Sequence, residues 1–309
     1  MKHLLTFLFW GIFFLFPSTS VAQDALNYLD MEKEILEIKY QPLLAKTDKE
    51  RINAGFRIQD LLLEGLKSPA SFVYPFDSLK YSTIAIAGDE SSPLRLFTYN
   101  AILSTGKFVH FGVIQYKVKK NIVTYSLLDT SENLPKNADE EALPSEQWIG
   151  ALYYQIKPFK FNKKQLYLVF GFDGHNLSSN RSILDVLYFE ENEPVFGFPL
   201  FRSGDEDPTP ENRVIFEYHK SAKMVLRYQP EVDMIILDHL EPAYERVKGN
   251  YSYYIPTGDY EGYAKEGKTW VKKQVNEMPF AEDPKKIDVK KLPKPGPEDL
   301  KINLGTIPE

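Results

Sequence analysis

The chain contains no cysteine in its 309 residues. This absence excludes disulfide bonds, thiolate-bound zinc, iron–sulfur clusters and a cysteine nucleophile. It also excludes the lipid anchor of a bacterial lipoprotein, which is attached to a cysteine directly after the cleavage site. Stability must therefore come from a packed core, for which 43% hydrophobic and 14% aromatic residues are sufficient.

An excess of positive charge is also missing. The sequence carries 37 Lys and Arg against 43 Asp and Glu, which gives a formal net charge of −6. An acidic chain gains nothing from a phosphate backbone, so the charge argues against nucleic acid as a partner.

Long apolar runs are scarce, and the longest lies near the first residue. A basic start precedes the uncharged stretch Leu4–Phe16, and residues 20–22 supply the small side chains of a cleavage site. This pattern over residues 1–22 is typical of a secretory signal peptide. The alternative, a membrane anchor, needs about 20 apolar residues. We therefore expect a periplasmic or extracellular protein with no integral membrane span after signal cleavage, and the lack of disulfides favours a bacterial one.

Residues 23–70 have the pattern of a helical N-terminal unit. Asp24 is a candidate N-cap of a first helix, and Thr47 followed by Glu50 forms a capping-box pattern for a second. Ser68-Pro69 closes the second helix. These signals predict a short helical hairpin packed on a larger body.

Residues 71–278 predict an antiparallel β domain. About eleven short β-branched and aromatic runs follow one another with few connections long enough for a crossover helix. They cover residues 81–87, 94–99, 107–116, 121–128, 148–156, 165–172, 182–189, 194–201, 213–219, 224–228 and 232–237. We expect a mostly β fold, an antiparallel meander of β-sandwich or propeller-like form. Residues 279–309 are rich in proline and lysine and predict an extended tail.

Two strands differ in their expected burial. The run 165–172 is apolar on both faces, with Leu166, Leu168 and Phe170 on one and Tyr167 and Val169 on the other, so it should be central.

The run 213–219 should be half exposed or line a cleft. Its Glu217 and His219 share a face and are expected to meet Arg227 across a hairpin. His110 stands among apolar residues and is interpreted as a core histidine.

Four segments carry a resemblance: SFVYPFDSL at 71–79, LRLFTY at 94–99, IGALYY at 149–154 and ILDHL at 236–240. They resemble an uncharacterised family of secreted, β-rich proteins of Gram-negative bacteria, over most of residues 25–275. The resemblance implies export and a β-rich body, and it carries over no catalytic residue.

Residues 262–269 match the phosphate-loop pattern GxxxxGK[ST]. A true phosphate loop follows a buried parallel strand and precedes a helix, whereas polar turn residues stand before this match and an alternating, edge-like run follows it. We interpret the segment as a β-hairpin with Gly267 in its turn, and we expect no nucleotide and no cofactor.

The remaining candidate site residues are acidic residues and histidines. Asp238 and His239 are adjacent, so on one strand their side chains point to opposite faces and cannot form a direct catalytic dyad. Glu217 is the third weak catalytic candidate.

A turn at residues 173–176 is the first weak metal site. Asp173 and His175 are its candidate ligands, although a turn with Gly174 at positive φ and Asn176 bonded to the backbone explains the pattern better. Asp205 and Asp207 form a second acidic loop. Ca²⁺ is the ion such loops would take, but its further ligands at fixed spacing are missing.

None of the candidate catalytic patterns is supported by the residues around it. We therefore expect an exported, non-enzymatic binding or envelope-associated protein, with a glycan or an envelope protein as partner. A cluster of tyrosines at 251, 253, 254, 260 and 263 would provide a surface for stacking sugars. The alternative is a metal- or carboxylate-dependent hydrolase acting on glycans. Convergence of the candidate residues in one pocket would favour that enzyme.

Overall fold

The computed structural model describes residues 19–41, 45–88, 92–133, 138, 140–204 and 209–275. The predicted extended tail, Asp205 and Asp207, and all but the last residues of the predicted signal peptide lie outside these ranges. Within them, no helix combines the length and the apolar character that crossing a membrane requires.

Two helices begin the described chain, α1 (Thr19–Tyr40) and α2 (Asp48–Gly65). The capping box of α2 is confirmed, because Glu50 N donates to Thr47 Oγ1 and Thr47 N donates to Glu50 Oε2, each at 3.2 Å. The prediction that Asp24 caps α1 is wrong. The helix begins at Thr19, because alanine and glutamine favour the helical backbone before Asp24. A short helix, α3 (Asp77–Lys80), follows α2.

The strands form three sheets, and all but one of the pairs of neighbouring strands are antiparallel. The first sheet has the order β1 (Ala85–Ala87), β2 (Leu94–Ile102), β3 (Phe108–Val118) and β4 (Asn121–Leu128). The second has the order β5 (Leu143–Pro144), β9 (Glu193–Phe196), β8 (Ser179–Glu190), β7 (Lys164–Asp173) and β6 (Leu152–Phe161), with β11 (Val214–His219) also paired to β8. The third has the order β10 (Phe201–Arg202), β15 (Thr269–Val275), β14 (Tyr254–Glu266), β13 (Met234–Pro242) and β12 (Leu226–Gln229). The mostly β, antiparallel prediction is confirmed.

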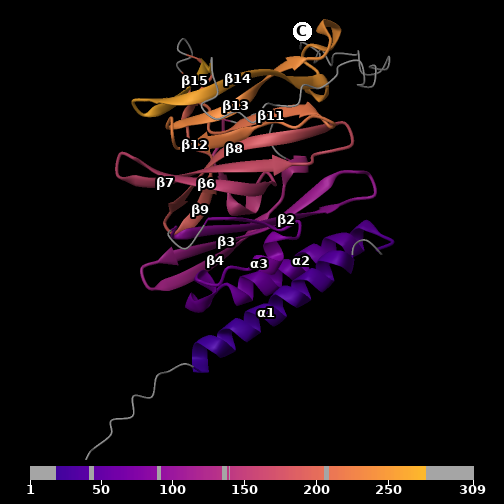
Figure 1. Ribbon diagram of the computed structural model, residues 1–309, viewed down its shortest axis with the longest axis vertical. Helices are drawn as coiled ribbons and strands as arrows, with labels where there is room; N and C mark the ends of the chain where they lie inside the picture. The colour runs from indigo at the N-terminus through magenta and orange to yellow at the C-terminus, as the bar shows by residue number, and fades with distance from the viewer. Residues whose placement is uncertain are drawn as a thin grey trace, which may run out of the picture.

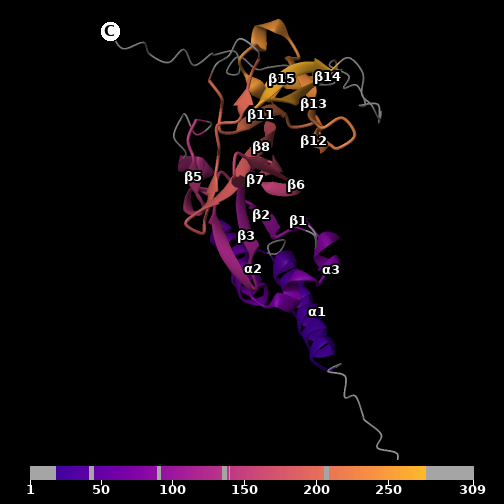
Figure 2. The same ribbon diagram turned by 90° about the vertical axis from the view of Figure 1, so that its left-hand side faces the viewer.

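The three sheets stack face to face along the long axis of the molecule, with the helices against the first sheet at one end (Figure 1, Figure 2). Each interface between layers has its own cluster of buried apolar side chains. One lies between the helices and the first sheet, one between the first and second sheets, and one between the second and third. The sheets thus form a linear stack, which is closer to a sandwich than to a ring of blades.

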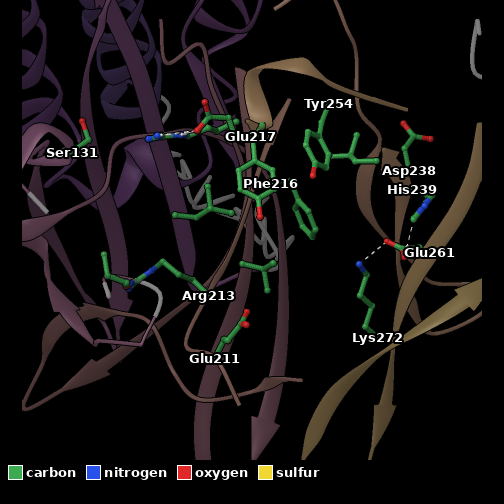
Figure 3. Close-up of a pocket in the computed structure, with 16 residues that line it drawn as sticks. Ser131, Glu211, Arg213, Phe216, Glu217, Asp238, His239, Tyr254, Glu261 and Lys272 are labelled. Carbon is green, nitrogen blue, oxygen red and sulfur yellow. Dashed lines mark hydrogen bonds and ion pairs between the residues drawn. The ribbon is translucent and has the colours of Figure 1, made fainter. Parts of the chain in front are cut away.

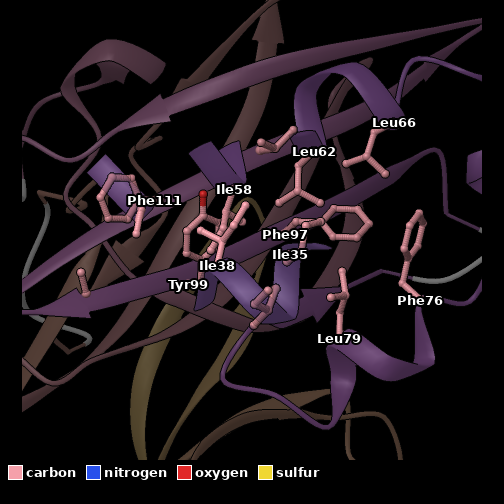
Figure 4. Close-up of a cluster of buried hydrophobic side chains, with 14 of the residues drawn as sticks. Ile35, Ile38, Ile58, Leu62, Leu66, Phe76, Leu79, Phe97, Tyr99 and Phe111 are labelled. Atoms are coloured by element: carbon pink, nitrogen blue, oxygen red, sulfur yellow. The ribbon is translucent and has the colours of Figure 1, made fainter. Parts of the chain in front are cut away.

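The helices pack closely on the first sheet (Figure 4). A Cβ on Gly55 of α2 would lie 2.3 Å from the ring of Phe111, so only glycine permits this approach. The hydroxyl of Tyr99 also donates to the Gly55 carbonyl at 2.8 Å. The helical unit and the first sheet therefore share one core.

Strand β7 is central, as its sequence predicts. Leu166, Leu168 and Phe170 belong to the cluster facing the third sheet, and Tyr167 and Val169 to the cluster facing the first. Because successive side chains of a strand point to opposite faces, a strand buried on both sides must be apolar at both sets of positions.

The phosphate-loop match folds as the predicted hairpin. Residues up to Glu266 belong to β14, Gly267 takes φ of +58° in the turn, and Ala264 pairs with Val271 of β15. A left-handed backbone of this kind favours glycine. The strand–loop–helix arrangement of a phosphate loop is therefore not formed by these residues.

One prediction about strand pairing is wrong. Strand β11 pairs with β8 of the second sheet rather than with β12, so Glu217 faces Arg181 instead of Arg227. The segment between β11 and β12 carries the chain from the second sheet to the third.

A buried ion pair anchors the start of β11. Arg213 Nε lies 3.0 Å from Asp185 Oδ2, and neither side chain is exposed. The Arg213 guanidinium also donates to the carbonyls of Ala138, Glu141 and Phe196. This one side chain therefore fixes Ala138 and Glu141 against the second sheet.

We predict that Asp185→Ala destabilises the protein by about 3–5 kcal/mol, because it leaves a buried guanidinium without its counter-charge. The free energy of unfolding in urea measures the loss. Glu190→Ala is the matched control on the same strand, where the exposed Lys164–Glu190 pair should contribute at most about 1 kcal/mol. Equal losses in the two variants would contradict the importance of the buried pair.

Candidate functional site

A large cavity lies between β11 of the second sheet and the third sheet, with a volume of about 690 Å³ (Figure 3). Its walls come from β8, β11, β13, β14 and β15, together with the 3-10 turn Tyr251–Tyr253. The lining residues are Ser131, Ala138, Arg181, Glu211, Arg213, Val214, Ile215, Phe216, Glu217, Asp238, His239, Leu240, Tyr251, Tyr254, Glu261 and Lys272. A cavity of this size accommodates a small-molecule ligand.

The wall from the third sheet carries a chain of charged side chains. His239 Nδ1 lies 3.0 Å from Glu261 Oε1, and Lys272 Nζ lies 2.6 Å from Glu261 Oε2 (Figure 3). Glu261 pairs in register with Leu237, and Lys272 with Tyr263. Cross-strand partners share a face, and Leu237 and Tyr263 belong to the apolar cluster between the second and third sheets. The charged side chains therefore lie at the boundary between that apolar cluster and the cavity.

Asp238 is the most unusual carboxyl group of the cavity. Its Oδ2 accepts a hydrogen bond from Val225 N at 2.7 Å, while its buried Oδ1 has no hydrogen-bond partner. Burial raises the pKa of the Asp238 carboxyl above its ordinary value. The Asp238 carboxyl therefore keeps its proton to a higher pH than an ordinary aspartate does.

The opposite wall is formed by β8 and β11. Arg181 reaches Glu217 Oε2 through Nε and Nη2, each at 3.1 Å. Ser179 Oγ donates to Glu217 Oε1 at 2.7 Å. Glu217 is therefore held in place and charge-balanced by its own sheet.

The cavity also has an aromatic edge. Tyr251 and Tyr254 line it with ring centroids 4.8 Å apart, and Tyr251 is 56% exposed. The other tyrosines of the predicted stacking cluster contribute less. Tyr263 is buried in the core, and Tyr253 faces the ring of His219 at 6.4 Å. The aromatic surface is thus smaller than the sequence suggests.

The candidate residues from the sequence divide between two pockets. Glu217, Asp238 and His239 line the large cavity, while Asp173 and His175 line a neighbouring pocket of about 290 Å³. Asp238 and His239 lie within β13 and bond to different partners, so they form no dyad.

The turn at residues 173–176 is built as expected in one respect. Asn176 Oδ1 accepts from Ser178 N at 2.7 Å and from Ser179 N at 2.9 Å. The prediction of positive φ at Gly174 is wrong, because His175 takes the left-handed conformation with φ of +50°. Its amide donates to Asp173 Oδ1 at 2.7 Å, which is a local turn bond.

His110 is a buried histidine whose position between two carboxylates the sequence does not predict. His110 Nδ1 lies 3.2 Å from Asp129 Oδ2, and its Nε2 lies 3.5 Å from Asp173 Oδ1. Burial alone would raise the pKa of Asp129, but hydrogen bonds from His110 and Ser131 lower it overall. The histidine is buried as expected, yet its two partners come from distant segments, so no local pattern could have found them.

Metal coordination finds no support among the residues that the structure describes. Across these ranges, no three His, Asp or Glu side chains are placed so that they could hold a metal ion. Asp173 and His175 therefore lack a third ligand of these types. Arg181, Glu261 and Lys272 are further residues of the site that the sequence does not predict, because a single charged residue on a strand gives no sign that it faces a cavity.

No protein-family model, curated protein or solved structure matches this chain. The function is therefore argued from the cavity itself, and the resemblance to secreted β-rich proteins stays an expectation from the sequence.

We predict that Asp238→Asn changes how stability depends on pH. A carboxyl whose pKa is raised in the folded state stabilises that state only while protonated. This stabilisation is lost as the pH rises from the ordinary carboxyl value of 3.8 through the raised one. Asparagine keeps an oxygen for Val225 N and cannot ionise. The free energy of unfolding of the variant should therefore rise relative to that of wild type across that pH range. Asp259→Asn, on an exposed residue, is the control. A constant difference between Asp238→Asn and wild type would contradict the prediction.

Proposed function

We propose that the protein is an exported binding protein whose large cavity takes a neutral glycan. Export is supported by the signal-peptide pattern of residues 1–22. The observation that carries the proposed ligand is the combination of an exposed tyrosine edge with cations that are each already paired with a carboxylate.

Pairing of the charges favours an uncharged ligand. Glu217 is matched by Arg181, and Glu261 by Lys272 and His239. Arg213 is neutralised by Asp185. A phosphate or another anion would find no free cation among these groups, whereas sugar hydroxyls can bridge such pairs as both donors and acceptors.

The tyrosines supply the second half of sugar recognition. An aromatic ring packs on the apolar face of a sugar ring, while the hydroxyls at the ring edge bond to polar groups. Tyr251 is exposed at the cavity edge, and Glu261 and Lys272 lie within the same cavity. A sugar placed here would therefore find both kinds of contact.

We predict that Tyr251→Ala lowers glycan affinity about tenfold, equivalent to about 1.4 kcal/mol, because it removes one stacking ring. Isothermal titration with maltose-, cello- and chito-oligosaccharides measures the change. Tyr81→Ala, on a tyrosine that is 91% exposed next to the helices, is the matched control and should bind as wild type does. If none of these saccharides binds to the wild-type protein, the glycan proposal fails.

Asp238 favours a second candidate function, hydrolysis of a glycosidic bond. Its readily protonated carboxyl would give a proton to the leaving oxygen, while a carboxylate such as Glu217 took a proton from the attacking water. The C–O bond to the leaving sugar would break, and a new C–O bond to water would form.

For this second function, we predict that reducing ends appear when the protein is incubated with an oligosaccharide that it binds. Asp238→Asn and Glu217→Gln should each lower the rate by about a hundredfold or more. Measuring reducing ends over time tests this. Binding without any release of reducing ends would leave the binding proposal and exclude the hydrolase.

A further inference from the structure

The large cavity and the neighbouring pocket meet at two shared side chains. Both are lined by Ser131 and by Arg181. The second pocket continues beyond them along the end of β7 and the start of β3, where its walls include Phe108, Asp173 and His175. The two hollows are therefore adjacent, with Arg181 at the boundary between them.

The second pocket has a firmly built wall. The turn after β7 is held by bonds from Ser178 and Ser179 to Asn176 Oδ1. Lys220 Nζ also donates to the Gly174 carbonyl at 2.6 Å. A segment bonded at so many points loses little conformational freedom when a ligand binds, and such preformed sites bind more tightly.

The chemistry of the second pocket repeats that of the first. Phe108 supplies an aromatic ring, against which Gly174 packs so closely that a Cβ there would lie 2.4 Å from it. Lys107 Nζ lies 2.8 Å from Glu132, while Asp173 lies 3.5 Å from His110 Nε2 and 3.7 Å from His175 Nδ1. Burial and the charge of Arg181 lower the pKa of His175. A neutral imidazole offers one donor and one acceptor to hydroxyl groups.

Resting on the proposed function, we propose that the two pockets are subsites of one groove, which binds an extended oligosaccharide rather than a single sugar. One part of the chain stacks near Tyr251 and Tyr254. The next part passes Ser131 and Arg181, and a further sugar packs on Phe108 between the turn at 173–176 and Lys107.

The test is titration calorimetry with saccharides of one to six units from whichever series the wild-type protein binds. Affinity should rise with length, so that the hexasaccharide binds at least about tenfold more tightly than the monosaccharide. In Phe108→Ala this ratio should fall to near one. In Tyr251→Ala both affinities should fall, while the ratio is kept.

Lys107→Ala provides a second variant in case Phe108→Ala does not fold, because the Lys107 side chain is 57% exposed and pairs only with exposed Glu132. It should lower the ratio about threefold. Wild-type affinity that does not depend on length would overturn the extended groove and leave the single-sugar proposal standing. An unchanged ratio in both Phe108→Ala and Lys107→Ala would overturn it too. Failure of every saccharide to bind would overturn the proposed function as well.

Discussion

Burial of both faces of the second sheet is the constraint on which the rest of the structure depends. Strands β7 and β8 lie between two other sheets, so their central side chains, at 166–170 and 183–188, must be apolar apart from Asp185. The polar exception, Asp185, is tolerated because Arg213 neutralises it within the core. The same arginine holds Ala138, Glu141 and the start of β11, which forms a cavity wall. A requirement of the core thereby positions the candidate site.

The cavity lies where the stacking of the second and third sheets ends. Strand β11 pairs with β8, and the chain then crosses to the third sheet, so the two sheets are not in full contact near β11 and β13. Charged side chains on the inner face of the third sheet, such as Glu261 and Lys272, stand at this boundary. Charges that lie partly out of water need partners, and the cations of this cavity, Arg181, Arg213 and Lys272, are each balanced by a carboxylate. This balance is the physical basis for expecting a neutral, hydroxyl-rich ligand.

Much of the fold could be predicted from the sequence because its signals are local. The capping box at Thr47, the two apolar faces of β7 and the hairpin around Gly267 each depend on residues within one element or one turn. The hairpin also shows why a motif needs its context. Residues 262–269 match a phosphate loop in letters, yet the alternation after Gly267 is that of a strand. One error arose where a distant partner decides the outcome, because the sequence places β11 in a hairpin with β12, whereas β11 pairs with β8.

Local sequence signals alone predict α2 and most of the strands with their apolar faces, because a strand's alternation repeats every two residues and needs no distant information. Which polar residues meet depends on the tertiary structure. His110 lies between Asp129 and Asp173, and Glu217 shares a cavity with Asp238, because residues from different sheets come together when the sheets stack. That stacking follows from the summed burial of many apolar side chains, which no single segment encodes.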